Sequence, residues 1–405
     1  MSTRDIHVVI VGMSVAGTAV ARTVAALSLQ GYPNLRVTMV DKNEFYYHVL
    51  GAPRAVVEKG FGKKLLWPIH NYLENYEVDK ANPKHKFIQA SLKAVNSDKT
   101  IELSDGQVLA FDYLVLSTGS TNKTPSHFTG TTYEAIEKQM DDVYENVKEA
   151  KEILIIGGGA VGVEVAGEIA HAYKDKKITL VHSAERLLPL NFKAGLSNGA
   201  VDKLQRLGVR VVLNEKIELP QGVEFNCKIR PLELKGSSGA TYKSDLQILT
   251  TGATVNAQYI ETLERQFGDT LRTERGTIKV RSTLQLASDK MPTVFVPGDV
   301  NSLPAGTKFA MKVGEQAETV GKNIVTMIKA NYDQVQREVP QLSDYKGGDM
   351  AMILVPIGKE LGVFQGFNIA FGKSFVGNFM SSKLKAKDYF VSKFSPNFPA
   401  PAPAK

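Results

Sequence analysis

KEILIIGGGAVGVEVAG, residues 151–167, contains the strongest structural signal in this chain. Its apolar run from Ile153 to Ile156 is typical of a buried parallel strand. Gly157, Gly159 and Gly162 follow in the pattern G-x-G-x-x-G, which makes a tight turn, lets backbone approach a pyrophosphate and packs the next helix closely. The start of that helix offers free N–H groups to phosphates. We therefore predict a strand–turn–helix unit that binds a dinucleotide.

A near-copy of this pattern lies at the start of the chain. The apolar run from Ile6 to Val11 predicts a buried strand, and Gly12-Met13-Ser14-Val15-Ala16-Gly17 follows, with Ser14 in place of the middle glycine. The next predicted strand, residues 36–41, ends in Asp41, and an acid there can accept hydrogen bonds from both hydroxyls of an adenosine ribose. The alternative is a generic βαβ turn with an acidic strand end. We favour a second dinucleotide site.

Two later strands end alike. FDYLVLSTGS, residues 111–120, and SDLQILTTGA, residues 244–253, each end a predicted strand in a Thr-Gly turn, at Thr118-Gly119 and Thr251-Gly252. Such an ending suits the approach of backbone to a ligand at the carboxyl edge of a sheet. Each dinucleotide fold thus has its own closing strand.

A third motif, TVFVPGD at residues 293–299, ends in Asp299, which can bond a ribityl hydroxyl of a flavin. Residues 308–330 predict the helix that follows, and its N-terminal dipole would favour a reduced, anionic flavin. This late motif belongs to the first fold, so the second fold is inserted within it.

The predicted fold class is therefore α/β, with two Rossmann-like dinucleotide-binding domains and a small C-terminal region. We assign residues 1–122 and 245–335 to an FAD-binding domain, residues 123–244 to an inserted NAD(P)H-binding domain and residues 336–405 to the C-terminal region. Such a pair of folds holds a flavin and a nicotinamide so that hydride passes from one to the other. The predicted cofactors are FAD and NAD(P)H.

Two residues of the second fold bear on the coenzyme. Glu164 lies near the N-terminal end of the predicted helix and can reach a nicotinamide amide; the alternative is an acid favoured by the helix dipole. His182 ends the strand of KITLVHS, residues 177–183, where an acid would meet the second adenosine ribose. Because Arg186 follows and can accept a 2′-phosphate, the choice between NADH and NADPH stays open.

The C-terminal region has a different composition. Its phenylalanines recur at spacings of three or four and would form one aromatic stripe on a helix, and three lysines follow them. The stripe either packs on the main body or a partner subunit, or forms a site for a lipid surface or a lipophilic substrate. The tail from about residue 395 is expected to be disordered. The residues concerned are Phe364, Phe367, Phe371, Phe375, Phe379, Lys383, Lys385 and Lys387.

Composition excludes several classes of protein. The single cysteine, Cys227, rules out a disulfide framework and a C-x-x-C redox pair, and no metal site is predicted. No apolar run of about 18 residues indicates a membrane span. The net charge of +7 permits attraction to an anionic surface. Specific nucleic-acid binding is not expected, because the lysines are dispersed without interleaved aromatic residues.

Four stretches carry a family resemblance. The runs GGGAVGVEVAGEI and KITLVHS, the segment FYYHVLGAPRAVVEKGF and the block KAKDYFVS resemble the ferroptosis-suppressor branch of the apoptosis-inducing-factor-like oxidoreductases, over nearly the whole chain. The nucleotide motifs are shared by all flavoproteins with two dinucleotide folds, whereas the segment around Arg54 and the C-terminal block are more specific. The resemblance implies FAD-dependent NAD(P)H:quinone reduction, with ubiquinone-like or vitamin-K-like acceptors.

The resemblance also implies roles for individual residues. Residues 12–17, Arg54, Leu92 through its backbone, and Asp299 would hold FAD; Glu164 would serve the nicotinamide, and Lys385 matches a family lysine tied to activity near the flavin. From the sequence alone, Arg54 faces a phosphate or flavin, or caps a helix. Ser2 removes the N-terminal lipid anchor that some members carry. Membrane attachment would then depend on the basic, phenylalanine-rich C-terminus.

These observations predict an NAD(P)H:quinone oxidoreductase. The rival hypothesis is a redox-sensing protein that forms a reduced-flavin complex and then binds a partner or nucleic acid. We expect a cytoplasmic protein. Peripheral contact with a membrane or lipid droplet, association with mitochondria and formation of a homodimer are left open.

Overall fold

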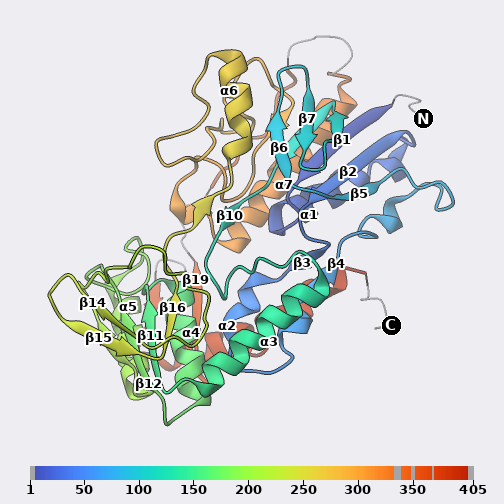
Figure 1. The fold of residues 1–405 in the computed structure, drawn as a ribbon. Helices are drawn as coiled ribbons and strands as arrows, with labels where there is room; N and C mark the ends of the chain where they lie inside the picture. The colour runs from blue at the N-terminus through green and yellow to red at the C-terminus, as the bar shows by residue number, and fades with distance from the viewer. Residues whose placement is uncertain (1–4, 333–338, 348–351, 367–368, 400–405) are drawn as a thin grey trace.

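The protein is described by a computed structural model that covers residues 5–332, 339–347, 352–366 and 369–399. Figure 1 shows two lobes, with the blue N-terminal and orange later segments sharing one lobe and the green middle segment forming the other. The chain therefore leaves the first lobe, builds the second and returns, which is the α/β arrangement of two Rossmann-like domains that the sequence predicts.

The first lobe is built on a parallel five-stranded sheet in the order β18-β9-β1-β2-β5. The central strand β1 is buried at every residue, because it has a strand on each edge and a layer on each face. Helices α1 and α7 pack together on one of these faces. The bounds are β1 (Ile6–Val11), α1 (Val15–Ala25), β2 (Leu35–Asp41), β5 (Lys86–Gln89), β9 (Tyr113–Leu116), β18 (Val294–Phe295) and α7 (Ala310–Lys329).

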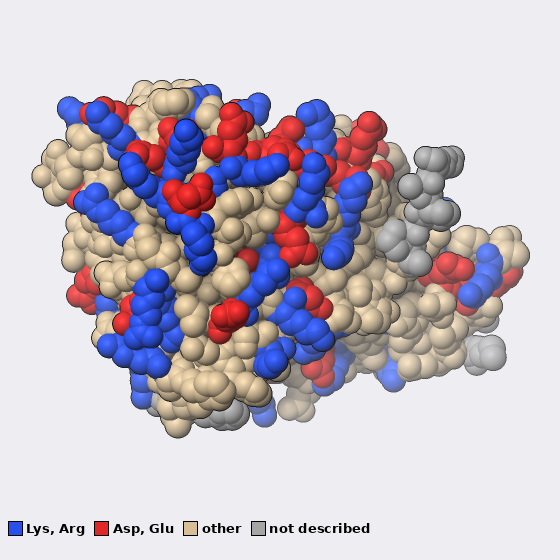
Figure 2. Space-filling model, turned by 90° about the horizontal axis from the view of Figure 1, so that it is seen from below, with Lys and Arg blue, Asp and Glu red and all other residues tan. Residues whose placement is uncertain are grey.

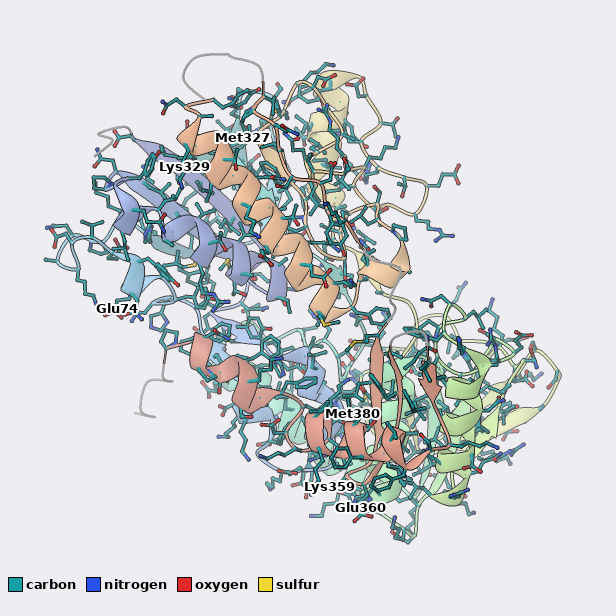
Figure 3. The ribbon with its side chains drawn as sticks, turned by 180° about the vertical axis from the view of Figure 1, so that it is seen from behind. Glu74, Met327, Lys329, Lys359, Glu360 and Met380 are labelled. Carbon is teal, nitrogen blue, oxygen red and sulfur yellow. The ribbon has the colours of Figure 1, made fainter. Side chains whose placement is uncertain are left out.

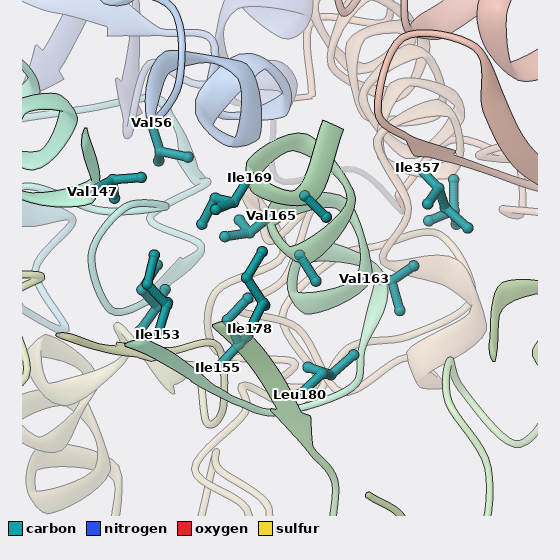
Figure 4. Packing of buried hydrophobic residues seen from close by; sticks show 14 of the residues in the cluster. Val56, Val147, Ile153, Ile155, Val163, Val165, Ile169, Ile178, Leu180 and Ile357 are labelled. Carbon is teal, nitrogen blue, oxygen red and sulfur yellow. The ribbon is translucent and has the colours of Figure 1, made fainter. Parts of the chain in front are cut away.

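The second lobe is built on a parallel four-stranded sheet in the order β13-β12-β11-β16. Helix α4 begins directly after β11, as the glycine pattern predicts. Figure 4 shows apolar side chains of β11, β12 and α4 meeting in the core of this lobe, with Val147 of α3 and Ile357 at its borders. The bounds are α3 (Tyr133–Glu149), β11 (Glu152–Ile156), α4 (Ala160–Ala172), β12 (Lys177–Val181), α5 (Ala194–Arg206), β13 (Arg210–Val212) and β16 (Leu246–Leu249).

Smaller elements connect and extend these sheets. They are β3 (Phe45–Tyr47), α2 (Ala52–Ala55), β4 (Leu66–Pro68), β6 (Leu92–Val95), β7 (Thr100–Leu103), β8 (Val108–Ala110), β14 (Leu232–Lys235), β15 (Thr241–Ser244) and α6 (Glu261–Phe267). Strands β6, β7 and β8 form an antiparallel sheet of their own, and β3 pairs with β4.

Two short antiparallel strands, β10 (Ser120–Thr121) and β17 (Thr254–Val255), carry the chain between the lobes. After β17 the chain returns to β18, which pairs with β9, so the strand before Asp299 lies in the first sheet. One predicted boundary needs correction. Residues 246–249 form β16 of the second sheet, although we placed the change of domain at residue 245, because the closing strand of an inserted sheet belongs to the insertion.

The C-terminal region adds a three-stranded antiparallel sheet and three short helical segments. These are β19 (Ile353–Ile357), β20 (Leu361–Gly366), β21 (Ile369–Phe371), α8 (Phe375–Met380), a π-helix over Ser381–Lys385 and α9 (Val391–Phe394). Seen from behind in Figure 3, this salmon-coloured region lies as a layer against the second lobe. Strand β19 packs against α4, and β20 packs against α5.

The predicted aromatic stripe on one helix is wrong. Phe364 lies on β20 and stacks on Phe371 of β21, with ring centroids 5.8 Å apart, whereas only Phe375 and Phe379 share a helix. Phe367 lies outside the described residues. The glycines here allow close contacts between elements: a Cβ on Gly362 would lie 2.2 Å from the side chain of Ser381 and 2.8 Å from the carbonyl oxygen of Val355.

The expectation of disorder from about residue 395 is also wrong for residues 395–399. Ser395–Asn397 form a short 3-10 turn, and the ring of Phe398 lies 4.6 Å from that of Tyr46. Packing against the aromatic residues of the first lobe orders this segment. In the described parts of the chain, helices are too short or too polar for a membrane crossing.

Candidate active site

The first glycine of each fingerprint has the left-handed backbone that its turn requires. Gly12 has a φ of +91°, and a Cβ there would lie 2.4 Å from the carbonyl oxygen of Ser117. Gly157 has a φ of +117° in the second fingerprint. A Cβ on Gly17 or Gly162, the last glycine of each pattern, would lie 1.9 Å from the carbonyl oxygen of the first. Both turns therefore depend on glycine for steric reasons.

The middle position tolerates serine. Ser14 has a φ of −91°, and the corresponding Gly159 has a φ of −69°, so neither needs a left-handed backbone. Within the described part of the chain, no side chain caps the first turn of α1 or α4. The N–H groups there stay available, which is what a pyrophosphate at a helix N-terminus needs. The residues present thus fit an FAD at the first fingerprint and a nicotinamide coenzyme at the second.

A hydroxyl group that the sequence analysis missed locks each fingerprint to its closing strand. Ser117 Oγ donates to the carbonyl of Val11 at 2.9 Å or that of Gly12 at 2.8 Å. In the second fold, Thr250 Oγ1 likewise donates to the carbonyl of Ile156 at 3.2 Å or that of Gly157 at 2.8 Å. The signal was the hydroxyl residue before each Thr-Gly pair. In the first turn, Thr118 bonds instead to Asn256 and Tyr259.

The residues at the ends of β2 and β12 also occupy matching positions. Asp41 accepts from the N–H of Met13 at 2.7 Å, and His182 Nδ1 accepts from the N–H of Gly158 at 3.1 Å. This bond requires an unprotonated Nδ1, and burial lowers the pKa of His182, which keeps the ring neutral. Burial raises the pKa of Asp41, while bonds from Met13 and Asn43 oppose that rise. The second site thus has a neutral imidazole where the first has a carboxyl group.

The remaining predicted cofactor residues lie at the carboxyl ends of strands or in loops beside them. Asp299 follows β18 and accepts from Ser120 Oγ at 3.0 Å. Gly119 and Gly252 have left-handed backbones with open space around them, and Leu92 begins β6. Lys308 Nζ donates to the carbonyl of Gly298 at 2.9 Å, and burial lowers its pKa to about 8. The lysine amine thereby holds the turn that carries Asp299.

Five residues from distant parts of the chain form what we call the buried charge cluster: Arg54, Glu164, Glu168, Lys385 and Tyr389. Lys385 Nζ lies 2.5 Å from Glu164 Oε1. Arg54 donates to both oxygens of Glu168 through Nε and Nη2, at 2.7 and 3.0 Å. The hydroxyl of Tyr389 donates to Glu168 Oε1 at 2.8 Å. In Figure 1, α2, α4 and β19, the elements around this cluster, lie close together.

The charges in the cluster balance, because two carboxylates face two cations. Burial raises the pKa of Glu164, and the ammonium of Lys385 opposes that rise. Removing one member of a buried pair leaves an uncompensated charge, which costs about 3–5 kcal/mol. The cluster therefore holds its members in place, and it brings the predicted residues Glu164 and Lys385 together.

Arg54 pairs with Glu168, a partner that we did not expect. Its guanidinium also donates to the carbonyl of Ala386 at 2.8 Å, and Ala386 is the C-cap residue of the π-helix, so the expected capping of a helix is observed. A role for Arg54 in holding FAD stays a prediction. No local sequence pattern indicates the pairing of Arg54 with Glu168, because the two residues are 114 positions apart.

A comparison with family models decides the family. The model of the pyridine nucleotide-disulphide oxidoreductases matches residues 6–330. The chain belongs to this family. Members of the family are NAD(P)H-dependent flavoprotein oxidoreductases, and the predicted cofactors, FAD and NAD(P)H, are confirmed by this membership.

Relatives and solved structures agree with this assignment. The chain is 29% identical to ferroptosis suppressor protein 1 of Homo sapiens, over 96% of this chain and 94% of the relative. It is 28% identical to apoptosis-inducing factor homolog A of Dictyostelium discoideum, over 100% and 95%. The resemblance inferred from the sequence is thus confirmed. The sulfide:quinone oxidoreductase of Aquifex aeolicus shares the fold, with a TM-score of 0.69 at 16% identity over 98% of this chain and 93% of that one.

Proposed function

We propose that this oxidoreductase transfers electrons from NAD(P)H to a lipophilic quinone of the ubiquinone or vitamin-K type. The observation that carries the proposal is the Lys385–Glu164 pair, which joins the helix after the second fingerprint to the C-terminal region. The names of the relatives similar over the full length, and the quinone named for one structure of the same fold, support it.

The lone cysteine supports an organic acceptor over a disulfide. Cys227 is buried, its thiol lies 3.4 Å from the carbonyl oxygen of Thr124, and burial raises its pKa to about 12. A thiol that stays protonated is a poor nucleophile and redox centre. Electrons from the flavin therefore have no cysteine pair in this chain to reduce.

The cofactors supply the hydride chemistry, and the residues of the chain supply position and a proton. Two-electron reduction of a quinone to a quinol consumes a hydride equivalent from NAD(P)H and one proton from solvent. We propose that Lys385, which is buried and paired with Glu164, holds that proton. Glu164 lies on the second turn of α4, and we propose that it also binds the carboxamide of the nicotinamide there.

A cavity of about 480 Å³ borders the cluster at Arg54. Its lining includes Glu58, Phe61, Ala386 and Val391, so it combines apolar walls with charged groups. We propose that it gives protons or an acceptor access to the buried charge cluster.

Separate half-reactions test these roles. In stopped-flow measurements, we expect Glu164→Gln to slow flavin reduction by NADH or NADPH, and Lys385→Met to slow reoxidation by a short-chain quinone by about 10²-fold. Lys383→Met, two residues away and exposed, is the matched control and should keep both rates. The double variant Glu164→Gln/Lys385→Met keeps the cluster neutral if a single variant folds poorly. Wild-type rates in both half-reactions of Lys385→Met would refute the assignment.

The rival function is a redox sensor that binds a partner when its flavin is reduced. Its support is the net charge of +7. On the face drawn in Figure 2, however, Lys and Arg side chains are interspersed with Asp and Glu, which does not favour a nucleic-acid surface. Rapid multiple turnover with NADH and a soluble quinone supports the enzyme, whereas a long-lived reduced complex with negligible turnover supports the sensor.

The finer localisation follows from the proposed acceptor. We propose a cytoplasmic protein that meets its quinone at the surface of a membrane or lipid droplet, through the C-terminal region. A homodimer through the same region is the alternative, and sedimentation equilibrium distinguishes the two.

A further inference from the structure

The helix formed by α8 and the following π-helix, residues 375–385, exposes its apolar side chains to solvent. Phe375 is 78% exposed, Phe379 is 49% exposed, Leu384 is 48% exposed and Val376 is 41% exposed. The rings of Phe375 and Phe379 lie 6.0 Å apart on neighbouring turns. We call these four residues the outer side of the helix. In Figure 3 the helix, marked by Met380, lies on the face of the C-terminal region turned toward the viewer.

The inner side of the same helix is small and polar, which is the reverse of an ordinary surface helix. Gly377, Ser381 and Lys385 recur every four residues and are buried. A Cβ on Gly377 would lie 2.0 Å from the carbonyl oxygen of Phe371, and Lys385 pairs with Glu164. The helix cannot rotate its phenylalanines inward without breaking this ion pair and forcing bulk into a closed contact.

The exposed charged side chains in the stretch of chain that carries the outer side are mostly lysines. From residue 361 to the last residue, the only acid is Asp388, and its carboxylate accepts the N–H groups of Phe390 and Ser392, at 3.0 and 2.9 Å. The exposed lysines among the described residues of this segment are Lys373, Lys383, Lys387 and Lys393, whereas Lys385 is buried and paired with Glu164. An apolar strip bordered by exposed lysines complements a lipid surface, where anionic headgroups cover the apolar acyl chains.

A second copy of the chain fits this surface less well. In a two-fold symmetric contact the same patch meets itself, so Lys373 and Lys383 would face lysines of the other copy without acids to balance them. Burying like charges opposite one another disfavours that arrangement.

We propose that the outer side of residues 375–385 docks on an anionic lipid bilayer, with Phe375, Phe379 and Leu384 in the interfacial layer. This proposal concerns membrane binding and not the reaction. It rests on the proposed function only in that a lipophilic acceptor gives the protein a reason to bind a membrane. The helix that meets the lipid carries Lys385 on its opposite side. An acceptor dissolved in the bilayer would therefore lie about one helix diameter, roughly 10 Å, from the buried charge cluster.

Vesicle sedimentation tests the surface. The full-length holoprotein is incubated with phosphatidylcholine vesicles, with and without phosphatidylserine. We expect binding to the phosphatidylserine vesicles that weakens with added salt, and a loss of at least about tenfold in Phe375→Ser/Phe379→Ser. The matched control is Leu29→Ser/Val78→Ser, which removes two apolar side chains of the first lobe that are more than half exposed, and this variant should bind like the wild type.

Two further measurements separate the outcomes. Turnover with a soluble quinone should be unchanged in Phe375→Ser/Phe379→Ser, and thermal unfolding should show that the variant is folded. Vesicle binding that depends on the two phenylalanines supports the docking surface, whether or not a quinone is reduced. If the protein binds vesicles but reduces no quinone, only the proposed function is refuted. Absence of wild-type binding, equal loss in both variants, or a dimer that the phenylalanine variant dissociates would overturn the docking proposal.

Discussion

Tyr389 contacts three of the four other members of the buried charge cluster, Arg54, Glu168 and Lys385, although its sequence position does not suggest this. Its ring lies under the guanidinium of Arg54, 5.3 Å from the ring centroid, and under the ammonium of Lys385 at 5.7 Å. His48 Nε2 donates to its carbonyl at 2.7 Å. Tyr389 and Phe390 both have a left-handed backbone, with φ of +53° and +67°, which costs about 1–3 kcal/mol each and persists only where surrounding contacts impose it.

We expect Tyr389→Phe to lower the free energy of unfolding by about 1–3 kcal/mol, because it removes a hydrogen bond to a buried carboxylate and keeps the ring. Burial raises the pKa of Tyr389 well above its usual range, so the hydroxyl keeps the proton that it donates to Glu168. Denaturant unfolding of the holoprotein measures the change.

Tyr72→Phe is the control for this substitution. Its hydroxyl donates to a neutral carbonyl, that of Thr18 at 3.3 Å, and we expect the smaller loss of about 1 kcal/mol. If the two variants lose the same stability, the hydroxyl of Tyr389 has no special role in the cluster.

At the scale of elements, the segment after Lys385 forms a strap, residues 390–398, that crosses from the second lobe back to the first. Phe394 packs on His48 with ring centroids 5.2 Å apart, and Phe398 packs on Trp67 and Tyr72, both at 5.0 Å. The strap thus joins the aromatic residues of the first lobe to the segment that carries Lys385.

We expect Phe394→Ala/Phe398→Ala to destabilise the protein by on the order of 2 kcal/mol, because both rings are partly buried against other aromatic residues. Phe375→Ala, at a ring that is mostly exposed, should change stability by less than about 0.5 kcal/mol. Thermal unfolding of both variants checks the difference. An equal effect would mean that the strap does not hold the two lobes together.

At the scale of the whole molecule, burial depresses histidine pKa values throughout both lobes. Five of the seven histidines have lowered pKa values with burial as the largest cause, and those of His7 and His127 fall to about 4; the others are His48, His85 and His182. Such a group takes up its proton in the unfolded chain at a higher pH than in the folded protein. The unfolded state therefore binds more protons as the pH falls below about 6.5.

We accordingly expect stability to be lost between about pH 6.5 and pH 4, with each histidine adding up to about 1.4 kcal/mol per pH unit before solvent screening reduces it. Melting temperatures across this range measure the slope. His7→Gln should make the slope shallower, whereas His70→Gln, at an exposed position, serves as the control. Parallel curves for wild type and His7→Gln would contradict the assignment.

Much of the architecture is readable from local pattern. The two glycine fingerprints, the strands before them and the helix predicted at residues 308–330, found as Ala310–Lys329, all agree with the structure. Their signals lie within one turn or one period, and steric limits on φ and the burial of apolar runs act at that range. The predicted stripe of phenylalanines was wrong because it used only local spacing. That spacing fits a helix, but contacts around Gly362 and Gly377 with other parts of the chain favour two strands and a short helix.

By itself, the sequence determined that the chain holds two dinucleotide folds and which glycines form their turns, because a turn without room for a Cβ has no other solution. Only the tertiary structure decided that Lys385 meets Glu164 across 221 residues, that Arg54 meets Glu168, and that the helix carrying Lys385 turns its phenylalanines outward. Partners so distant in the chain are chosen by how the two lobes and the C-terminal strap pack, and no spacing along the sequence records that choice.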